Sequence, residues 1–220
     1  VYFAHCFPYT YTSLQRYVKD VQDDDRISKF CRVRSLATTL AKNTCDILTI
    51  TAKSDRDNDV RNRPSVVISA RVHPGETNAS FMMHGVIQFL TSEDPMARTL
   101  RDYFVFRIVP MLNPDGVIHG NYRCSLTGQD LNRRYADCSP TFHPTIAAMK
   151  GLLESVQQSS GVYLYLDLHG HSRNKNAFVY GCDLHMTQKK VLKKDSFKPE
   201  SIIDQRIFSR IFPQILCQSR

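Results

Sequence analysis

Apolar residues along the chain follow two spacings, one typical of buried strands and one typical of helices. Compact apolar runs at 65–72, 103–111 and 162–168 predict strands that are covered on both faces of a sheet. Apolar residues at helical spacing predict helices at 77–90 and 144–156. Strands that alternate with helices along the chain indicate an α/β fold.

The first quarter of the chain gives shorter signals. We expect a strand at 3–7 and then a helix that buries Leu14, Val18 and Val21 on one face. Two further strands are predicted at 32–39 and 46–53, joined by a turn, and the polar stretch 54–64 predicts an exposed loop.

Composition and charge narrow the class of protein. Hydrophobic residues make up 42% and charged residues 23% of the 220 positions, a balance typical of a soluble globular chain. No apolar stretch approaches the roughly 20 residues that a membrane span needs, so we expect no membrane partner. The net charge of +8 favours acidic partners, and the basic residues form no known nucleic-acid motif. Seven cysteines without a disulfide-like pattern indicate reduced thiols and a cytosolic location.

Each of the three predicted buried strands ends in a cluster of polar residues. The clusters are His73-Pro74-Gly75-Glu76, Asn113-Pro114-Asp115-Gly116 and His169-Gly170-His171. Because α/β folds bind ligands beyond the carboxyl ends of their strands, we expect chemistry at these three places.

The first cluster has the residue types of a catalytic zinc site. With eight His and four Glu in the chain, the spacing of His73 and Glu76 is expected about 0.15 times by chance. Two histidines, one glutamate and an open fourth position form a recognised catalytic zinc set. The second histidine is expected to be His169, with His171 as its rival on the loop beyond.

A segment rich in arginine follows between the second and third strands. Arg123 is followed by Gly128-Gln129-Asp130-Leu131-Asn132-Arg133-Arg134-Tyr135, which has little regular periodicity. Guanidinium groups match the planar geometry of a carboxylate and can also polarise a carbonyl during attack. The segment therefore predicts a loop that grips an anionic substrate.

Taken together, these motifs resemble those of the zinc carboxypeptidases of the carboxypeptidase A type. The motifs that carry the resemblance, in chain order, are His73-Pro74-Gly75-Glu76, Asn113-Pro114-Asp115-Gly116, Asp130-Leu131-Asn132-Arg133 and Asp167-Leu168-His169-Gly170-His171. Two further segments narrow the resemblance to the cytosolic carboxypeptidases: Phe7-Pro8-Tyr9-Thr10-Tyr11-Thr12 and Asn121-Tyr122-Arg123-Cys124-Ser125-Leu126. The resemblance implies an αβα sandwich around a mixed, mostly parallel sheet.

The resemblance also implies a role for individual residues. One Zn²⁺ per chain would be bound by His73, Glu76 and His169, with Asp130 orienting His73 from behind. Arg123 would contact the substrate and act as the catalytic residue that stabilises the oxyanion. Asn132 and Arg133 would hold the C-terminal carboxylate of the substrate.

The extent of the chain leads to two expectations. Residues 1–12 are expected to form the boundary (seam) with an N-terminal β-sandwich, or the last strand of that β-sandwich. Residues 13–220 are expected to form the N-terminal part of a catalytic domain that is truncated at its C-terminus. The family's general base is a glutamate some 70 or more residues after the second zinc histidine, whereas 51 residues follow His169 here. Because Glu200 has the context of a helix start, we expect the base to lie elsewhere and these 220 residues alone to hydrolyse peptides poorly.

Three functions remain open at this point. The first is a zinc metallocarboxypeptidase of the cytosol that removes C-terminal or side-chain glutamates from acidic protein tails such as those of tubulin, in association with microtubules. The second is an aspartoacylase-like hydrolase of N-acyl amino acids. The third is a non-catalytic zinc-containing binding module.

Overall fold

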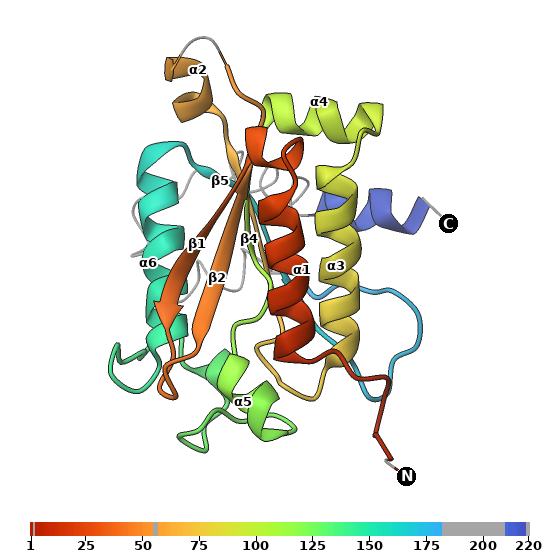
Figure 1. Ribbon diagram of the computed structural model, residues 1–220, viewed down its shortest axis with the longest axis vertical. Coiled ribbons are helices and arrows are strands. Elements are labelled where there is room, and N and C mark those ends of the chain that lie inside the picture. The colour runs from red at the N-terminus through yellow and green to blue at the C-terminus, as the bar shows by residue number, and fades with distance from the viewer. Residues whose placement is uncertain (2, 55–56, 182–209, 219–220) are drawn as a thin grey trace, which may run out of the picture. The chain divides into compact units, whose positions relative to one another are not determined.

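The computed structural model describes residues 1, 3–54, 57–181 and 210–218 (Figure 1). The chain forms two compact units, Val1–His171 and Ser172–Arg220. In the second unit, residues 210–218 are helical, and Glu200 lies outside the described residues. None of the described helices is long and apolar enough to span a bilayer.

A mixed five-stranded sheet forms the centre of the first unit. Its order is β1-β2-β4-β3-β5, with β1 antiparallel to β2, β2 antiparallel to β4, and β3 parallel to both β4 and β5. Every strand except β2 therefore runs in the same direction, and the predicted mixed, mostly parallel sheet is confirmed. The strands are β1 Cys31–Thr38, β2 Thr44–Ile50, β3 Ser65–Ala70, β4 Val105–Val109 and β5 Val162–Leu168.

Helices cover both faces of the sheet and complete the αβα sandwich. Figure 1 shows α1 (Tyr11–Asp23) and α3 (Thr77–Thr91) on one side and α6 (Pro144–Ser159) on the other. Side chains alternate between the faces along a strand, so neighbouring residues of β3 enter different cores. Ile68 packs in the cluster that includes α1 and α3, whereas Val67 packs in the cluster that includes α6.

The local predictions differ from the structure in several places. Residues 3–7 form no strand, because no neighbouring strand pairs with them among the described residues. The predicted loop 54–64 contains a short helix, α2 (Asp57–Asn62). The unpredicted helix α4 (Pro95–Tyr103) begins at a cap in which the Asp94 carboxylate accepts from the Met96 N–H at 2.8 Å.

The predicted turn at 113–116 is the start of another short helix, α5 (Pro114–His119). The Asn113 side chain caps it by accepting from the Gly116 N–H at 3.0 Å. Pro114 follows at the first helical position, where its missing N–H costs nothing. The assignment of 1–12 as a seam with another domain stays a prediction.

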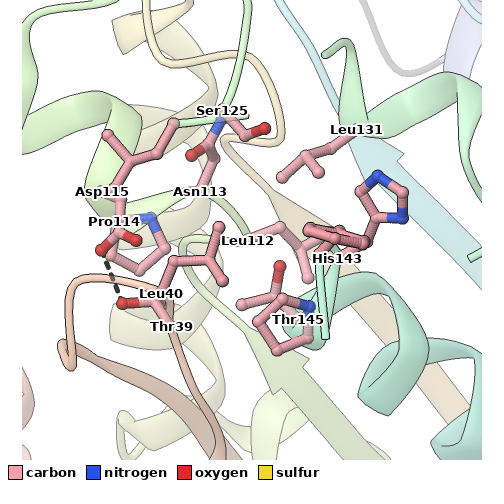
Figure 2. A pocket seen from close by; sticks show the side chains of 13 residues that line it. Thr39, Leu40, Leu112, Asn113, Pro114, Asp115, Ser125, Leu131, His143 and Thr145 are labelled. Atoms are coloured by element: carbon pink, nitrogen blue, oxygen red, sulfur yellow. Dashed lines mark hydrogen bonds between the residues drawn. The ribbon is translucent and has the colours of Figure 1, made fainter. Parts of the chain in front are cut away.

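The carboxylate of Asp115 joins α5 to the β1–β2 turn (Figure 2). It is only 4% exposed and accepts from the Thr39 hydroxyl at 2.5 Å, the Asn43 amide at 2.8 Å and the Ala41 N–H at 3.0 Å. The neighbouring cavity in Figure 2 is about 20 Å³, room for about one water molecule. We therefore assign this region to stability and not to substrate binding.

Replacing Asp115 should destabilise the fold without touching the predicted metal site. Asp115→Ala leaves three donors without their acceptor, so the free energy of unfolding in urea should fall by about 2 to 4 kcal/mol. The matched control is Asp137→Ala, which removes an exposed carboxylate paired with Arg134 and should cost about 0.5 kcal/mol or less. Equal losses in the two variants would contradict the role assigned to Asp115.

Candidate metal centre

Two neighbouring parallel strands bring the two predicted zinc histidines together. The final pair in the register of β3 and β5 is Ala70 opposite Leu168. His73 and His169 follow these strand ends, and their ring centroids lie 5.0 Å apart. Residues that are 96 positions apart in the sequence therefore meet because the sheet pairs their strands in register.

The turn that carries His73 is held by a buried arginine. Arg71 is 3% exposed and has a left-handed backbone with φ of 56°, which is unfavourable for a residue with a Cβ. Its guanidinium donates to the carbonyls of Pro74 and Tyr9 at 2.8 and 3.1 Å and to the Ser80 hydroxyl at 2.7 Å. These bonds fix the turn from its inner side and offset the backbone strain.

The outer side of the same turn requires a glycine. Gly75 donates its N–H to the Tyr122 carbonyl at 2.8 Å, and a Cβ at Gly75 would lie 2.7 Å from that carbonyl oxygen. The turn therefore packs directly against the loop that carries Arg123.

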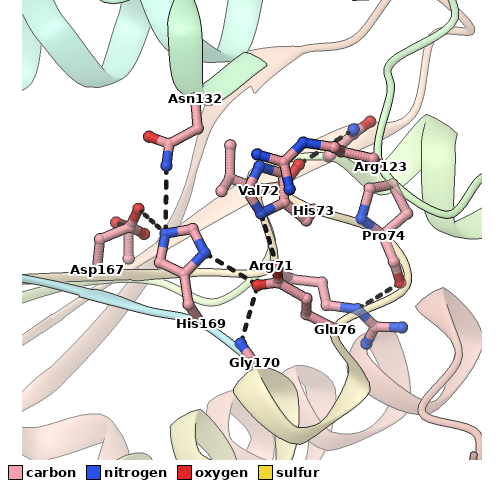
Figure 3. Close-up of polar contacts among 12 residues, drawn as sticks. Arg71, Val72, His73, Pro74, Glu76, Arg123, Asn132, Asp167, His169 and Gly170 are labelled. Atoms are coloured by element: carbon pink, nitrogen blue, oxygen red, sulfur yellow. Dashed lines mark hydrogen bonds and ion pairs between the residues drawn. The ribbon is translucent and has the colours of Figure 1, made fainter. Parts of the chain in front are cut away.

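Glu76 lies between the two imidazoles (Figure 3). Its Oε1 is 2.8 Å from His73 Nδ1, and its Oε2 is 2.9 Å from His169 Nδ1. Oε2 also accepts from the Gly170 N–H at 2.9 Å. One ligand atom from each of His73, Glu76 and His169 lies within 4.8 Å of the others, and among the described residues this is the one such group that could hold a metal ion.

The electrostatics of the cluster suit a bound cation. Burial raises the pKa of Glu76, but hydrogen bonds from His169, His73 and Gly170 outweigh it and lower that pKa to about 2. Hydrogen bonds to Asp167 and Glu76 raise the pKa of His169 to about 10. The surrounding carboxylates thus favour positive charge between the imidazoles. Two imidazole nitrogens and a carboxylate form a donor set that fits Zn²⁺.

An aspartate lies behind each imidazole. His73 Nε2 is 3.0 Å from Asp130 Oδ1, and His169 Nε2 is 2.7 Å from Asp167 Oδ2. A proton held on each Nε2 by its aspartate leaves the Nδ1 lone pair directed at the metal position. The structure brings Asp130 to the place that the sequence predicted for it. No role was predicted for Asp167, which lies on β5 two residues before His169.

Asp167 is in turn held by polar side chains of the sheet. Its Oδ1 accepts from the Ser69 hydroxyl at 2.6 Å, and Ser69 is its direct neighbour in the β3–β5 register. The Ser69 hydroxyl contacts the Tyr165 hydroxyl at 3.0 Å, which lies 3.3 Å from the Tyr135 hydroxyl. Burial raises the pKa of both tyrosines, so their hydroxyls stay protonated. Asp167 is thus fixed by a hydrogen-bonded chain that reaches the core.

Asp130 connects the metal cluster to the arginine-rich loop. It caps the short helix η2 (Leu131–Arg133) by accepting from the Asn132 N–H at 2.9 Å, and its Oδ2 accepts from Arg123 Nε at 2.8 Å. The Asn132 amide lies 3.4 Å from His169 Nε2. Arg133 is exposed and donates only to the Asn132 carbonyl at 3.2 Å among the described contacts. The structure therefore brings Arg123 and Asn132 to the cluster and leaves the Arg133 guanidinium open to solvent.

The rival histidine lies elsewhere. His171 is exposed, and it is absent from the donor group identified among the described residues. Of the two rival histidines, His169 is therefore the one that the structure brings to the donor group, and its role as a zinc ligand stays a prediction.

Zinc affinity should depend on the ligands and on Asp167. His73→Ala should lose most of the bound zinc, of which we expect one ion per chain. Asp167→Asn keeps the side-chain shape but removes its charge, so zinc affinity should fall about 10- to 100-fold. Chelator competition followed by elemental analysis measures both effects, with Asp137→Asn as the matched control that should bind zinc normally. If Asp167→Asn also binds zinc normally while folded, the positioning role of Asp167 is wrong.

Comparisons with known proteins agree with this geometry. The sequence profile of the family described as zinc carboxypeptidase matches residues 15–198. Cytosolic carboxypeptidase 3 of Bos taurus is 49% identical over 182 residues, which cover 83% of this chain and 18% of that protein. Cytosolic carboxypeptidase 2 of Homo sapiens is 43% identical over 218 residues, which cover 99% of this chain and 22% of that protein. The chain thus spans about a fifth of the length of these relatives.

Solved structures extend the comparison to the fold. The metallo-carboxypeptidase from Burkholderia cenocepacia aligns with a TM-score of 0.70 and 28% identity, covering 88% of this chain and 47% of that chain. The sheet order, the donor cluster and these relatives point the same way: the chain belongs to the zinc carboxypeptidase family, among the cytosolic carboxypeptidases.

Proposed function

We propose that this protein is a zinc-dependent carboxypeptidase of the cytosol that removes C-terminal or side-chain glutamates from acidic protein tails such as those of tubulin. The observation that carries the proposal is the convergence of His73, Glu76 and His169, with Arg123 joined to the same cluster through Asp130. Its relatives are named cytosolic carboxypeptidases, which supports both the reaction type and the location.

The residues around the cluster suit recognition of an anionic peptide end. Arg133 offers an exposed guanidinium that can form paired hydrogen bonds with a C-terminal carboxylate, and Asn132 adds an amide donor beside it. Zinc, when bound by the three ligands, supplies Lewis acidity that polarises the scissile carbonyl.

Arg123 is suited to a step that follows substrate binding. The Arg123 side chain is 44% exposed, and Asp130 holds its guanidinium through Nε, so its other donors remain available. Directed at the carbonyl oxygen, they stabilise charge that develops only during attack.

The described residues contain no second glutamate at the cluster. Glu93 pairs with Arg98 after α3, and Glu154 is exposed on α6. Asp130 and Asp167 are already bonded to the zinc histidines. Among the described residues, the carboxylates at the cluster are therefore all engaged by the two histidines, and hydrolysis is tested on the product of the whole reading frame.

The decisive assay measures free glutamate released from a peptide that ends in several glutamates. The product of the whole reading frame, loaded with zinc, should release glutamate from the peptide acid but leave the C-terminally amidated peptide uncut. Release should stop in His73→Ala, whereas His119→Ala, which changes an exposed histidine outside the cluster, should retain it. Cleavage of N-acetyl-aspartate without glutamate release would contradict the proposal in favour of an acylase. Zinc-dependent peptide binding without any hydrolysis would favour a binding module.

The same assay separates the two arginines. Arg133→Ala should raise KM for the peptide acid about tenfold or more, because a charged hydrogen bond to the carboxylate is lost. Arg123→Ala should lower kcat about 100-fold with a smaller change in KM, because its interaction strengthens in the transition state. If both variants change only KM, and by the same factor, the assigned roles are wrong.

A further inference from the structure

A second polar surface lies at the other end of the sheet from the metal cluster. The short helix η1 (Ile27–Lys29), the end of β2 and helix α4 meet there around a shallow concavity. Main-chain bonds join these segments, since Thr51 donates to the Phe30 carbonyl at 3.0 Å and Ala52 donates to the Arg101 carbonyl at 2.9 Å. The concavity is therefore part of the rigid fold.

The concavity and the metal cluster are separated by the length of a strand. The metal cluster follows the carboxyl end of β3, whereas α4 ends just before the amino end of the parallel strand β4. Figure 1 shows α4 at the opposite end of the sheet from α5, which follows β4. Six residues of β3 at about 3.3 Å each give a separation of about 20 Å. One ligand can reach both places only if it is a chain of about six or more extended residues.

The charge of the concavity is positive. Its lining contains five basic side chains and two acidic ones. Arg26 is paired with Asp24 at 2.8 Å, and Arg98 is paired with Glu93.

Two lysines on the rim remain available to a ligand. Lys29 and Lys53 are exposed, and neither forms an ion pair within the described part of the chain. They lie on different segments, so they border the concavity from two sides. Their ammonium groups are therefore free to meet carboxylates.

A buried positive charge lies at the floor. Arg101 is 4% exposed, with its guanidinium 4.2 Å from the centroid of the Phe30 ring. It donates to the main-chain carbonyls of Leu90 and Ser92 at 2.6 and 2.9 Å, and no described carboxylate lies within ion-pair distance. These two hydrogen bonds join α3 to α4. Because main-chain carbonyls are neutral, the positive charge of Arg101 beneath the concavity is not cancelled.

We propose that this concavity binds an acidic polypeptide segment of the substrate, upstream of the residues that are removed. The proposal rests on the proposed function, because it gives the acidic tail a second point of contact. Lysine ammonium groups act as mobile point charges, which suits the irregularly placed carboxylates of a flexible tail. Two weak contacts on one chain raise the overall affinity well above that of either contact alone.

A nucleic acid fits the same surface less well. Glu93 and Asp102 also line the concavity and would repel a continuous row of phosphates. The one aromatic ring in the lining, Phe30, already has one face occupied by the Arg101 guanidinium, which makes it a poor platform for base stacking. The mixed charges and the covered ring favour a polypeptide.

Binding of labelled peptides to the zinc-loaded chain tests the proposal. The probes are a glutamate-rich peptide of about twelve residues, long enough to span both places, and tri-glutamate, which is too short. Lys29→Glu/Lys53→Glu should raise Kd for the long peptide about tenfold and leave Kd for tri-glutamate unchanged. The matched control, Lys19→Glu/Lys150→Glu, makes the same change in net charge on α1 and α6 and should change Kd for the long peptide less than about twofold. Lys29→Gln/Lys53→Gln adds no new repulsion and should give an intermediate loss.

Several results would overturn the proposal. Among them are an equal loss in the control variant, an equal loss for tri-glutamate, and stronger competition by a single-stranded oligonucleotide than by the acidic peptide. Glutamate release from tri-glutamate by the product of the whole reading frame should be independent of the two lysines. If glutamate is released normally from tri-glutamate but the lysine variants do not change Kd for the long peptide, the proposed second site is wrong and the catalytic proposal stands. Lysine-dependent binding of the long peptide without any release would overturn the catalytic proposal instead.

Discussion

One carboxylate shared by two imidazoles is the interaction on which the site depends. Glu76 contacts Nδ1 of both His73 and His169, and the two histidines come from turns that follow neighbouring parallel strands. A slip of one residue between β3 and β5 would turn the side chains of one strand to the opposite face of the sheet. The register of these strands therefore determines whether the metal ligands can meet at all.

The surroundings of Glu76 explain how several ionisable groups can be partly buried together. Isolated charges are costly in a protein interior, but here each carboxylate is met by histidine, arginine or N–H donors. Asp130 and Asp167 fix the outer nitrogens of the imidazoles, so the inner nitrogens keep one orientation. The hydrogen-bonded chain from Asp167 to Tyr165 extends this rigidity into the sheet. A site held in this way is organised before a metal binds, which lowers the cost of binding it.

The sequence predicted the parts of this site that depend on local pattern. Buried strands that end in polar turns are visible in the sequence and predict His73, Glu76 and His169 as metal ligands. The structure brings the donor atoms of these three residues together. The role of Asp167 was not visible, because it depends on the partner that the strand register places opposite it, Ser69. The grip of Arg71 on the His73 turn depends likewise on contacts from distant segments.

The errors in the fold have a similar origin. Residues 3–7 have the composition of a strand, but a strand forms only where a neighbour supplies its hydrogen bonds. Helix α4 has a clear start at Asp94 and Pro95, yet its nine residues are too few for an apolar period to stand out. Local composition thus predicted the longer elements well, whereas short elements were decided by their partners.

The central claim is that one metal ion binds between the two Nδ1 atoms and Glu76. Anomalous diffraction from crystals of the zinc-loaded chain would locate the ion directly. We expect a single strong zinc peak about 2.0 to 2.2 Å from Nδ1 of His73, Nδ1 of His169 and the Glu76 carboxylate. A peak bound through Nε2 of either histidine, or one centred on His171, would contradict it.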